Sequence, residues 1–239
     1  MKNFVHNAAH ELKTPITGIR AATELLMDEE DDMPKDIKAQ FLKNILQDSD
    51  RLGRLIHNIL DFEKLETGRL NLDMQYQDIQ KTITKAISSI SQIAAKKEVQ
   101  IINKNTHTFS TNYDEDRILQ VLTNLLVNAG QAVAENGKIA VNSYMNDGFV
   151  EVSVSDNGSG IDDEHLSQLF NPFFTTKAEG EGTGLGLSIS FNIIKEHGGE
   201  ILVSSELGVG TCFTIRLPEN NACLLDHNTP TSDVRTTLI

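Results

Sequence analysis

The run Phe-Val-His-Asn-Ala-Ala-His-Glu-Leu-Lys-Thr-Pro-Ile, which occupies residues 4–16, contains the most informative pattern in the chain. Apolar residues recur at helical spacing from here to about Met27 and predict one amphipathic helix. His10 lies off the apolar face, with Thr14 one turn further along on the same side and Glu11 next to it. Neutral imidazole is nucleophilic near neutral pH, and a neighbouring carboxylate can accept the second proton of the ring, so the run predicts a reactive histidine on an exposed helix face. The predicted apolar face consists of Val5, Ala8, Leu12, Ile16, Ile19 and Leu26.

Pro15 stands inside this predicted helix, where a proline removes a hydrogen bond at a cost of roughly 3 kcal/mol. Such a cost beside His10 and Glu11 suggests a helix that bends where chemistry takes place. Two other interpretations of the run stay open. His6 and His10 are four residues apart and could form half of a zinc site, although Thr14 stands where a metalloprotease helix carries its second histidine. His10 could also be an ordinary solvated residue.

The composition restricts the class of function. The chain has 239 residues, 39% of them hydrophobic, which allows one large or two modest domains. A net charge of −13 argues against nucleic-acid binding, because phosphate contacts require patches of Lys and Arg. Cys212 and Cys223 imply no disulfide framework and are typical of a reducing compartment. No apolar run approaches the roughly 20 residues that span a bilayer and no signal peptide is visible, so we expect a soluble, cytoplasmic piece of a longer protein.

A second helix is predicted over residues 35–66, after an acidic stretch and Pro34 that end the first helix. Two long amphipathic helices in a hairpin cannot bury both apolar stripes alone, so the sequence predicts a four-helix bundle formed by a homodimer. The alternative is a hairpin that packs on the rest of its own chain. The predicted stripe of the second helix is heptad-like, is interrupted at Asp48, and consists of Ile37, Phe41, Ile45, Leu52, Leu55, Ile59, Phe62 and Leu65.

After Gly68 the pattern changes to short strands that alternate with helices. A strand over residues 69–75 and a helix over residues 79–97 are followed by a helix over residues 114–133 and by two strand hairpins. This order predicts a mixed sheet covered by helices on one face. The predicted fold class is therefore α+β: a helical-hairpin dimerisation domain over residues 1–68, an α/β sandwich over residues 69–220, and a tail over residues 221–239.

Two segments of the sandwich contain groups suited to a nucleotide. Asn124 and Asn128 lie one turn apart on one helix face and could hold hydrated Mg²⁺ with phosphate oxygens, or could be satisfied at the edge of the core. Asp156 ends an apolar strand and could accept a hydrogen bond from an adenine amino group, while Gly158 and Gly160 allow the backbone close to the base. The run Asp-Asn-Gly also marks an ordinary turn.

A glycine-rich segment, Gly-Thr-Gly-Leu-Gly-Leu at residues 182–187, leads directly into a predicted helix. Backbone N–H groups of such a turn can hold a polyphosphate. The segment lacks the Lys-Ser/Thr pair of a Walker loop and the preceding strand of a dinucleotide fingerprint. Residues 169–177 contain three phenylalanines and predict a lid that brings Lys177 toward phosphate.

Five motifs in this order, His-Glu-Leu-Lys-Thr-Pro, Asn-Leu-Leu-x-Asn-Ala, Asp-x-Gly-x-Gly, Phe-x-Pro-Phe-Phe and Gly-Thr-Gly-Leu-Gly-Leu, are highly specific. Over residues 1–218 the chain resembles the transmitter region of two-component sensor histidine kinases. The resemblance implies a dimerisation and histidine phosphotransfer domain followed by an ATP-binding domain of the gyrase, Hsp90, histidine kinase and MutL type. It implies ATP-dependent autophosphorylation, phosphoryl transfer to an aspartate of a response regulator, and phosphatase activity toward that regulator.

Carried over residue by residue, the resemblance makes His10 the phosphoacceptor, Glu11 its base, and Thr14 the group that positions water during dephosphorylation. Ala9 replaces a serine of many relatives, and Gln131 stands where many have a basic residue, a charge that Lys177 would supply. Asn128 is the implied Mg²⁺ ligand. The implied ATP-binding residues are Asn124, Asn128, Asp156, Gly158, Gly160, Lys177, Gly182, Thr183, Gly184, Leu185, Gly186 and Thr211.

The tail and two rival functions complete the predictions. Residues 222–228 and 232–238 resemble the first strand and opening helix of a receiver domain, although His227 departs from the usual acidic pair; a disordered tail is the alternative. An ATP-driven clamp or chaperone on the same nucleotide fold is the main rival function, and a non-catalytic scaffold is the other. The exposed His10 argues against the clamp, and Asn128, Asp156 and Gly184 argue against the scaffold.

Overall fold

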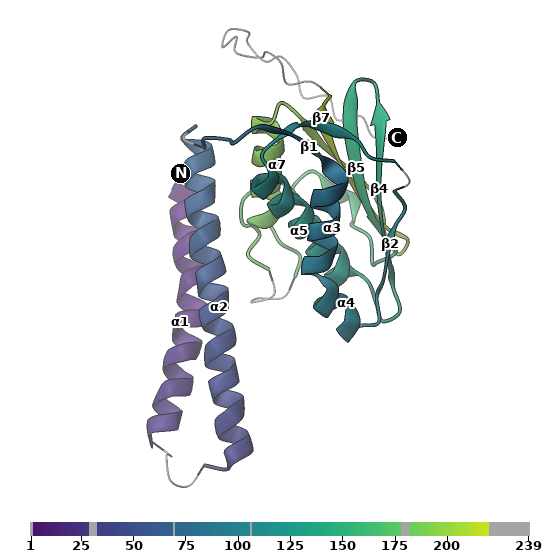
Figure 1. Ribbon diagram of the computed structural model, residues 1–239. Helices are drawn as coiled ribbons and strands as arrows, with labels where there is room; N and C mark the ends of the chain where they lie inside the picture. The colour runs from purple at the N-terminus through teal and green to yellow at the C-terminus, as the bar shows by residue number, and fades with distance from the viewer. Residues whose placement is uncertain (1, 29–32, 69, 106, 178–181, 220–239) are drawn as a thin grey trace. The chain divides into compact units, whose positions relative to one another are not determined.

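The chain folds into two units, which we describe from a computed structural model (Figure 1). The first unit comprises Met1–Leu70 and Leu169–Ile189, and the second comprises Asn71–Gln168 and Ser190–Ile239. The structure describes residues 2–28, 33–68, 70–105, 107–177 and 182–219. The predicted tail over residues 221–239, including Cys223 and His227, lies outside the described residues.

Two long helices form the hairpin of the first unit. The helices α1 (Lys2–Asp28) and α2 (Lys35–Glu66) run antiparallel and side by side, as Figure 1 shows. Both bounds agree with the prediction from apolar spacing, and α1 continues through Pro15. Thr67 and Gly68, whose φ is 62°, end α2 as expected. None of the described helices has both the length and the hydropathy that a membrane span requires.

The predicted apolar face of α1 is largely covered within the single chain. Ala8 is buried and Leu12, Ile19 and Leu26 are half-buried, whereas Ile16 of the same face is 51% exposed. Pro15 and Ala22, which were not assigned to this face, are buried as well. A Cβ atom on Gly18 would collide with the carboxylate of Asp48 on α2. Small residues on a helix face let two helix backbones approach closely. The side chain of Val5 lies outside the described residues.

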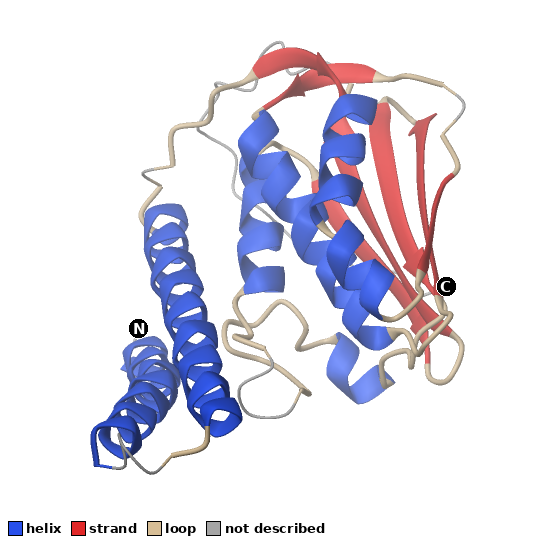
Figure 2. Cartoon of the chain, turned by 60° about the horizontal axis from the view of Figure 1, so that its bottom comes forward, coloured by secondary structure: helices blue, strands red, loops and turns tan. Residues whose placement is uncertain are grey.

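The second unit is a five-stranded mixed sheet in the order β2-β4-β5-β7-β6, which confirms the predicted mixed sheet. Strand β2 pairs parallel with β4, and the other neighbours pair antiparallel. Helices cover one face of the sheet, as Figure 2 shows. The strands are β2 (Gln100–Asn103), β4 (Lys138–Asn146), β5 (Phe149–Asp156), β6 (Glu200–Glu206) and β7 (Gly210–Pro218). The helices are α3 (Ile79–Ser89), α4 (Ser91–Lys96), α5 (Glu115–Ala132), α6 (Asp163–Leu166) and α7 (Gly186–Glu196).

Two local predictions in this unit were wrong. The strand expected over residues 69–75 is replaced by β1 (Gln75–Asp78), which pairs with β3 (Ser110–Tyr113) in a separate two-stranded sheet. The helix expected over residues 79–97 is broken at Ile90 into α3 and α4. Asp78 caps α3 by accepting a hydrogen bond from the Gln80 N–H at 2.9 Å, a signal that sequence reasoning did not use.

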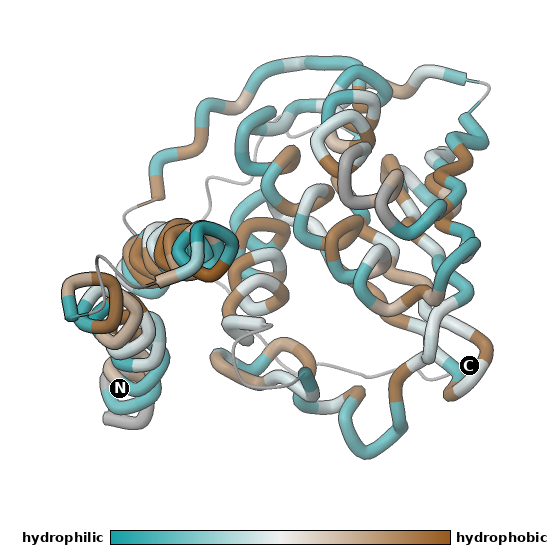
Figure 3. Tube along the Cα trace, turned by 90° about the horizontal axis from the view of Figure 1, so that it is seen from below, coloured by the Kyte–Doolittle hydropathy of each residue, from teal (hydrophilic) through white to brown (hydrophobic). Residues whose placement is uncertain are grey.

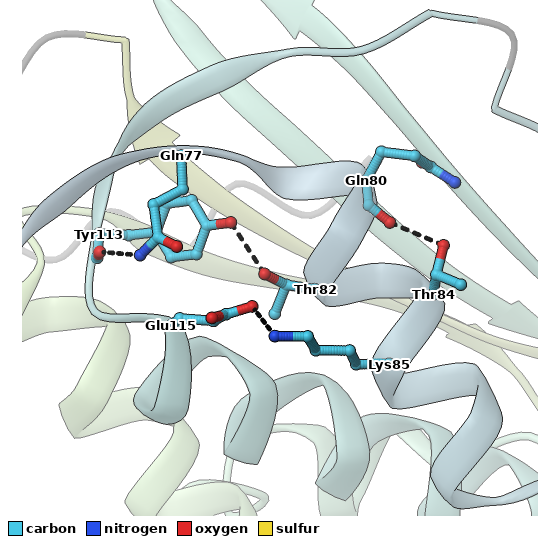
Figure 4. Close-up of polar contacts among 7 residues, drawn as sticks. All are labelled: Gln77, Gln80, Thr82, Thr84, Lys85, Tyr113 and Glu115. Carbon is cyan, nitrogen blue, oxygen red and sulfur yellow. Dashed lines mark hydrogen bonds and ion pairs between the residues drawn. The ribbon is translucent and has the colours of Figure 1, made fainter.

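Polar contacts join α3 to the region where α5 begins (Figure 4). The hydroxyl groups of Tyr113 and Thr82 lie 2.8 Å apart, and burial raises the pKa of Tyr113 to about 12. Lys85 on α3 pairs with Glu115 on α5 at 2.6 Å. Apolar residues on α3, α5 and α7 fill the space against the sheet, and Figure 3 shows apolar segments along these helices and along the hairpin. This packing holds α5, the helix of the predicted amide pair, on the sheet.

Candidate functional site

The predicted phosphoacceptor lies on the exposed side of α1. His10 is exposed, as the sequence predicted, and Thr14 is half-buried one turn further along. The Glu11 side chain is 24% exposed and accepts a hydrogen bond from Arg51 of α2, with Nη2 and Oε2 3.1 Å apart. Sequence reasoning missed Arg51, although its place one turn before Leu55, which is fully buried, could have indicated a guanidinium near the helix interface. The structure thus holds the proposed base between the two helices while the imidazole faces solvent.

We expect the Arg51–Glu11 pair to stabilise the hairpin measurably. Arg51 is only 12% exposed, so solvent screens this pair less than an ion pair on the surface. A double-mutant cycle with Arg51→Met and Glu11→Gln should give a coupling of about 1 kcal/mol in the free energy of urea unfolding. The exposed pair Arg20–Glu24 on α1, at 78% and 58% exposure, is the matched control and should show a smaller coupling. Equal coupling in the two cycles would contradict this expectation.

The amide pair has the predicted placement on α5. Asn124 and Asn128 are half-buried, whereas Leu125 and Leu126 between them are 0% and 1% exposed. Asn124 Nδ2 lies 3.4 Å from the hydroxyl of Ser190 on α7. Lys97 caps the end of α5, with Nζ 3.2 Å from the carbonyl oxygen of Gly130. Helix α5 therefore presents two amides on one partly exposed face, from which carboxamide oxygens can reach a ligand.

Asp156 forms the second element of the site, at the end of β5. Its carboxylate accepts a hydrogen bond from the Gly158 N–H at 2.8 Å, and its backbone is opposite Thr211 in the β5–β7 register. Burial raises the pKa of Asp156, and backbone hydrogen bonds from Gly158 and Thr211 offset this only in part. A partly buried carboxylate is suited to accept a hydrogen bond from a ligand.

The glycines after Asp156 are required by close backbone contacts. A Cβ atom on Gly158 would lie 2.7 Å from the carbonyl oxygen of Ala132 at the end of α5. Gly160 has φ 69°, and a Cβ atom there would collide with the carbonyl of Glu206. Ser159 N–H also donates to the Ala132 carbonyl at 3.2 Å. The loop after β5 is thus held against the end of α5, which brings the Asp156 loop and the amide helix together.

Thr211 is buried in a hydroxyl network that sequence reasoning only partly foresaw. Its Oγ1 lies 2.9 Å from Ser205 Oγ, and Ser205 accepts a hydrogen bond from the Ile161 N–H at 2.8 Å. Ser205 is a site residue that the sequence analysis missed. Its place opposite Thr211 in the β6–β7 register gives the physical reason for its role, and no local motif marks it.

The remaining predicted residues belong to the first unit. The glycine-rich segment Gly182–Gly186 leads into α7, and Gly184, with φ 64°, is so close to the backbone of Phe173 that a side chain would collide with it. Phe173 N–H donates to the Gly184 carbonyl at 2.9 Å, and Leu185 N–H lies 3.3 Å from Thr183 Oγ1. Lys177 N–H donates to Thr175 Oγ1 at 3.1 Å. The structure therefore joins the phenylalanine-containing loop to the glycine-rich segment.

Two family models match the chain. The model described as "His Kinase A (phospho-acceptor) domain" matches residues 1–68, and "Histidine kinase-, DNA gyrase B-, and HSP90-like ATPase" matches residues 113–221. The sensor histidine kinase ZraS of Escherichia coli is 36% identical over 214 residues, which are 89% of this chain and 44% of ZraS. The chain thus spans less than half the length of this curated relative.

Several solved structures of histidine kinases are also similar to this chain. The catalytic domain of the histidine kinase ThkA is 33% identical, with a TM-score of 0.57, and the match covers 62% of this chain and 97% of that domain. The chain belongs to the histidine kinase family. Histidine kinase AdeS of Acinetobacter baumannii matches with a TM-score of 0.74 at 26% identity, over 89% of this chain and 98% of AdeS. ThkA in complex with the response regulator protein TrrA matches with a TM-score of 0.72 at 29% identity, over 91% of this chain and 61% of ThkA.

In this histidine kinase, the residues of the second unit fit an adenine nucleotide. Burial raises the pKa of the Asp156 carboxyl, and close backbone contacts at Gly158 and Gly160 hold the loop beside it in place. The amides of Asn124 and Asn128 are oxygen donors of the kind that hard divalent cations prefer. The fold and the chemistry of these side chains are therefore consistent with the ATP-binding domain that the family model describes.

Proposed function

We propose that this chain transfers the γ-phosphoryl group of ATP to His10 and then to an aspartate of a response regulator. A single observation carries the proposal: an exposed histidine beside a carboxylate in one domain accompanies a partly buried Asp156 in an ATP-binding domain. We assign residues 1–68 to the dimerisation and phosphotransfer domain and residues 69–220 to the catalytic domain. We also propose a cytoplasmic location, consistent with the low cysteine content.

The mechanism follows from the charges on the reacting groups. A neutral ring nitrogen of His10 attacks the γ-phosphorus, the bond from that phosphorus to the ADP oxygen breaks, and ADP leaves with the electron pair. The positive charge that develops on the imidazole is stabilised when Glu11 takes or shares the proton on the other ring nitrogen. Because Arg51 also holds Glu11, the carboxylate stays oriented while this proton moves.

The catalytic domain binds and orients the nucleotide. Asp156 accepts a hydrogen bond from the adenine amino group, supported by Thr211. The glycines at positions 158, 160, 182, 184 and 186 would shape the pocket, since a side chain at 158, 160 or 184 would collide with neighbouring backbone. Lys177 lies on the phenylalanine-containing loop and would meet the phosphates as a cation. Asn128, supported by Asn124, would hold Mg²⁺, which offsets phosphate charge when bound.

The partner chemistry extends this proposal. Thr14 lies one turn after His10 and would orient a water molecule when the same enzyme dephosphorylates its regulator. The similarity to ThkA, whose structure is a complex with a response regulator, supports a receiver domain as the partner. The exposed surface around His10 is where this partner would dock, since the phosphohistidine must reach the aspartate.

We further propose a homodimer through α2. A second heptad stripe on this helix is exposed: Leu42, Leu46, Ile56 and Leu60 are 54%, 62%, 47% and 51% exposed, and Ser49 and Gly53 occupy the positions between them. Side chains at this spacing form one continuous seam along a helix. Pairing with the same seam of a second chain would bury these residues in a four-helix bundle.

Leu46→Glu should therefore dissociate the dimer. Each dimer would bury two such charges without partners, and the leucine contribution of about 1.5–3 kcal/mol per side chain would be lost, so we expect the dimer dissociation constant to rise at least about 100-fold. Light scattering after size-exclusion chromatography should show one chain instead of two. Gln47→Glu introduces the same charge at the neighbouring exposed position and should leave the mass of the dimer unchanged. A dimeric Leu46→Glu variant would rule out this seam.

Incubation with γ-labelled ATP distinguishes the kinase from its rivals. A kinase acquires acid-labile, base-stable label, as expected for a phosphorus–nitrogen bond. An ATP-driven clamp hydrolyses ATP without acquiring label, and a scaffold does neither. A clamp is disfavoured because it requires no exposed nucleophile, whereas this chain exposes His10.

A further inference from the structure

A buried histidine at the end of α7 takes no part in the proposed chemistry. His197 directly follows α7 and is 1% exposed. Its Nδ1 lies 2.7 Å from the carbonyl oxygen of Ile193, and its Nε2 lies 3.1 Å from the backbone nitrogen of Asp114. Because the Asp114 N–H can only donate, Nε2 must be the acceptor, and the ring proton must lie on Nδ1. The contacts thus define a neutral imidazole in one tautomer.

Asp114 connects three segments of the second unit. It is the N-cap of α5, and its carboxylate accepts a hydrogen bond from the Arg117 N–H at 3.1 Å. The other carboxylate oxygen accepts from the Asp73 N–H at 3.0 Å. Asp73 lies in the segment through which the chain enters this unit after the hairpin. His197 therefore contacts Asp114, and Asp114 in turn holds both the first turn of α5 and the segment at Asp73 through which the chain enters this unit.

A second polar contact between α5 and α7 involves Asn124, a residue of the proposed nucleotide site. Ser190, which is fully buried, lies seven residues before His197, close to two helical turns, and so on the same face of α7. Its hydroxyl lies 3.4 Å from Nδ2 of Asn124. Helices α5 and α7 are thus antiparallel and share polar contacts at two levels, at Asp114 and at Asn124. A shift of α7 along α5 would change both contacts, and the second involves an amide of the proposed site.

We propose that His197 is a positioning residue for the nucleotide site: its Nε2 anchors the end of α7 on the cap of α5 and so sets the register between the two helices. This inference rests on the proposed function. Helix α5 carries Asn124 and Asn128, and α7 begins at Gly186 in the glycine-rich segment. An apolar side chain could fill the volume of the ring, but it would leave the buried Asp114 N–H without an acceptor.

Two substitutions distinguish the hydrogen bond from Asp114 to Nε2, which we call the bridge, from the contact of Nδ1 with the Ile193 carbonyl at the end of α7. In His197→Gln, the side-chain oxygen can reach the position of Nε2 and accept from Asp114. In His197→Asn, the shorter amide can reach only the position of Nδ1 and donate to Ile193. The Ile193 carbonyl also accepts the His197 backbone N–H at 3.2 Å, so it keeps a partner in both variants. If the bridge positions the site, His197→Gln should retain nucleotide binding and His197→Asn should not.

The test measures binding of the Mg²⁺ complex of a non-hydrolysable ATP analogue to the full chain by calorimetry. We expect the dissociation constant to rise about 3–10-fold in His197→Asn and to change less than about twofold in His197→Gln, the effect of one hydrogen bond. His107→Gln, at an exposed histidine of the same unit, should have no effect. Equal affinity of the Asn and Gln variants overturns the inference alone. A wild-type chain that binds no analogue overturns the proposed function as well.

A pH series keeps the test decisive even if His197→Asn does not fold. Burial lowers the pKa of His197 below its ordinary value of 6.5, while the charges of Asp114 and Glu196 act in the opposite direction. Protonation of Nε2 removes the acceptor for Asp114, so as pH falls through this lowered pKa, affinity should fall more in the wild type than in His197→Gln. The ratio of the two dissociation constants cancels the titration of the ligand itself. A ratio independent of pH down to the point of unfolding contradicts the proposal.

Discussion

Replacing His10 by glutamine will lower incorporation of label from γ-labelled ATP by at least about 1000-fold, because the side-chain amide has no nucleophilic nitrogen. His10 is exposed on α1, so the substitution removes the acceptor without leaving a cavity. The folded state and nucleotide binding should both be retained. The measurement is label retained on the full chain after denaturing electrophoresis, with binding of the unlabelled analogue measured in parallel.

The matched control for this experiment lies one turn earlier on the same helix. His6 is also exposed, and His6→Gln should retain labelling close to the wild-type level. Label that survives acid, or label that persists in His10→Gln, would show that another residue accepts the phosphoryl group. Loss of label in both variants would indicate damage to the helix instead of loss of the nucleophile.

Replacing Asp156 by asparagine should weaken nucleotide binding without weakening the fold. Asparagine can still accept from the Gly158 N–H, but it loses the negative charge that would strengthen a hydrogen bond from the adenine amino group. Hydrogen bonds to charged groups contribute about 1.5–3 kcal/mol, so the dissociation constant of the ATP analogue should rise roughly 10- to 100-fold. Calorimetry on the full chain measures this change.

The stability of the same variant should move in the opposite direction. Burial raises the pKa of Asp156, so the folded state holds this proton more tightly than the unfolded state. Stability is therefore lost as pH rises from the ordinary carboxyl pKa of 3.8 through the raised one, and the cost is fully present at neutral pH. Asparagine removes this cost, so the free energy of urea unfolding at pH 7 should be unchanged or higher.

An exposed aspartate gives the control. Asp147, in the turn between β4 and β5, is exposed, and Asp147→Asn should leave the nucleotide affinity unchanged. Should Asp156→Asn bind the analogue as tightly as the wild type, the role of Asp156 as adenine anchor would be wrong. A variant that loses both affinity and stability would mean that the carboxylate is needed for the fold itself.

Local patterns were sufficient for much of the architecture. Helical spacing predicted both hairpin helices and the exposure of His10, because the period of apolar residues reports one helix independently of its neighbours. The same reasoning placed Asn124 and Asn128 on the partly exposed face of α5, beside the buried Leu125 and Leu126. The order of the five motifs was enough to indicate the family.

The face of a helix that meets its partner was not predictable in the same way. Ala8 and Ile16 both belong to the predicted apolar face of α1, yet Ala8 is buried and Ile16 is 51% exposed, while Ala22 outside that face is buried. The break at Ile90 and the place of β1 were also missed, since β1 exists only by pairing with β3, more than 30 residues away. Strand pairing and the close packing of helices decide such features, and the local spacing of apolar residues does not reveal either of them.

The sequence by itself determined the two hairpin helices, the motifs and the chemical character of His10, Asp156 and the glycines, since these depend on residue type and spacing along one segment. Only the tertiary structure decided that Arg51 holds Glu11 and that His197 meets Asp114, 83 residues away. The physical reason is that a hydrogen bond between distant residues depends on how helices pack and where chains cross. Periodicity restricts that packing but does not determine which residues of two neighbouring helices meet.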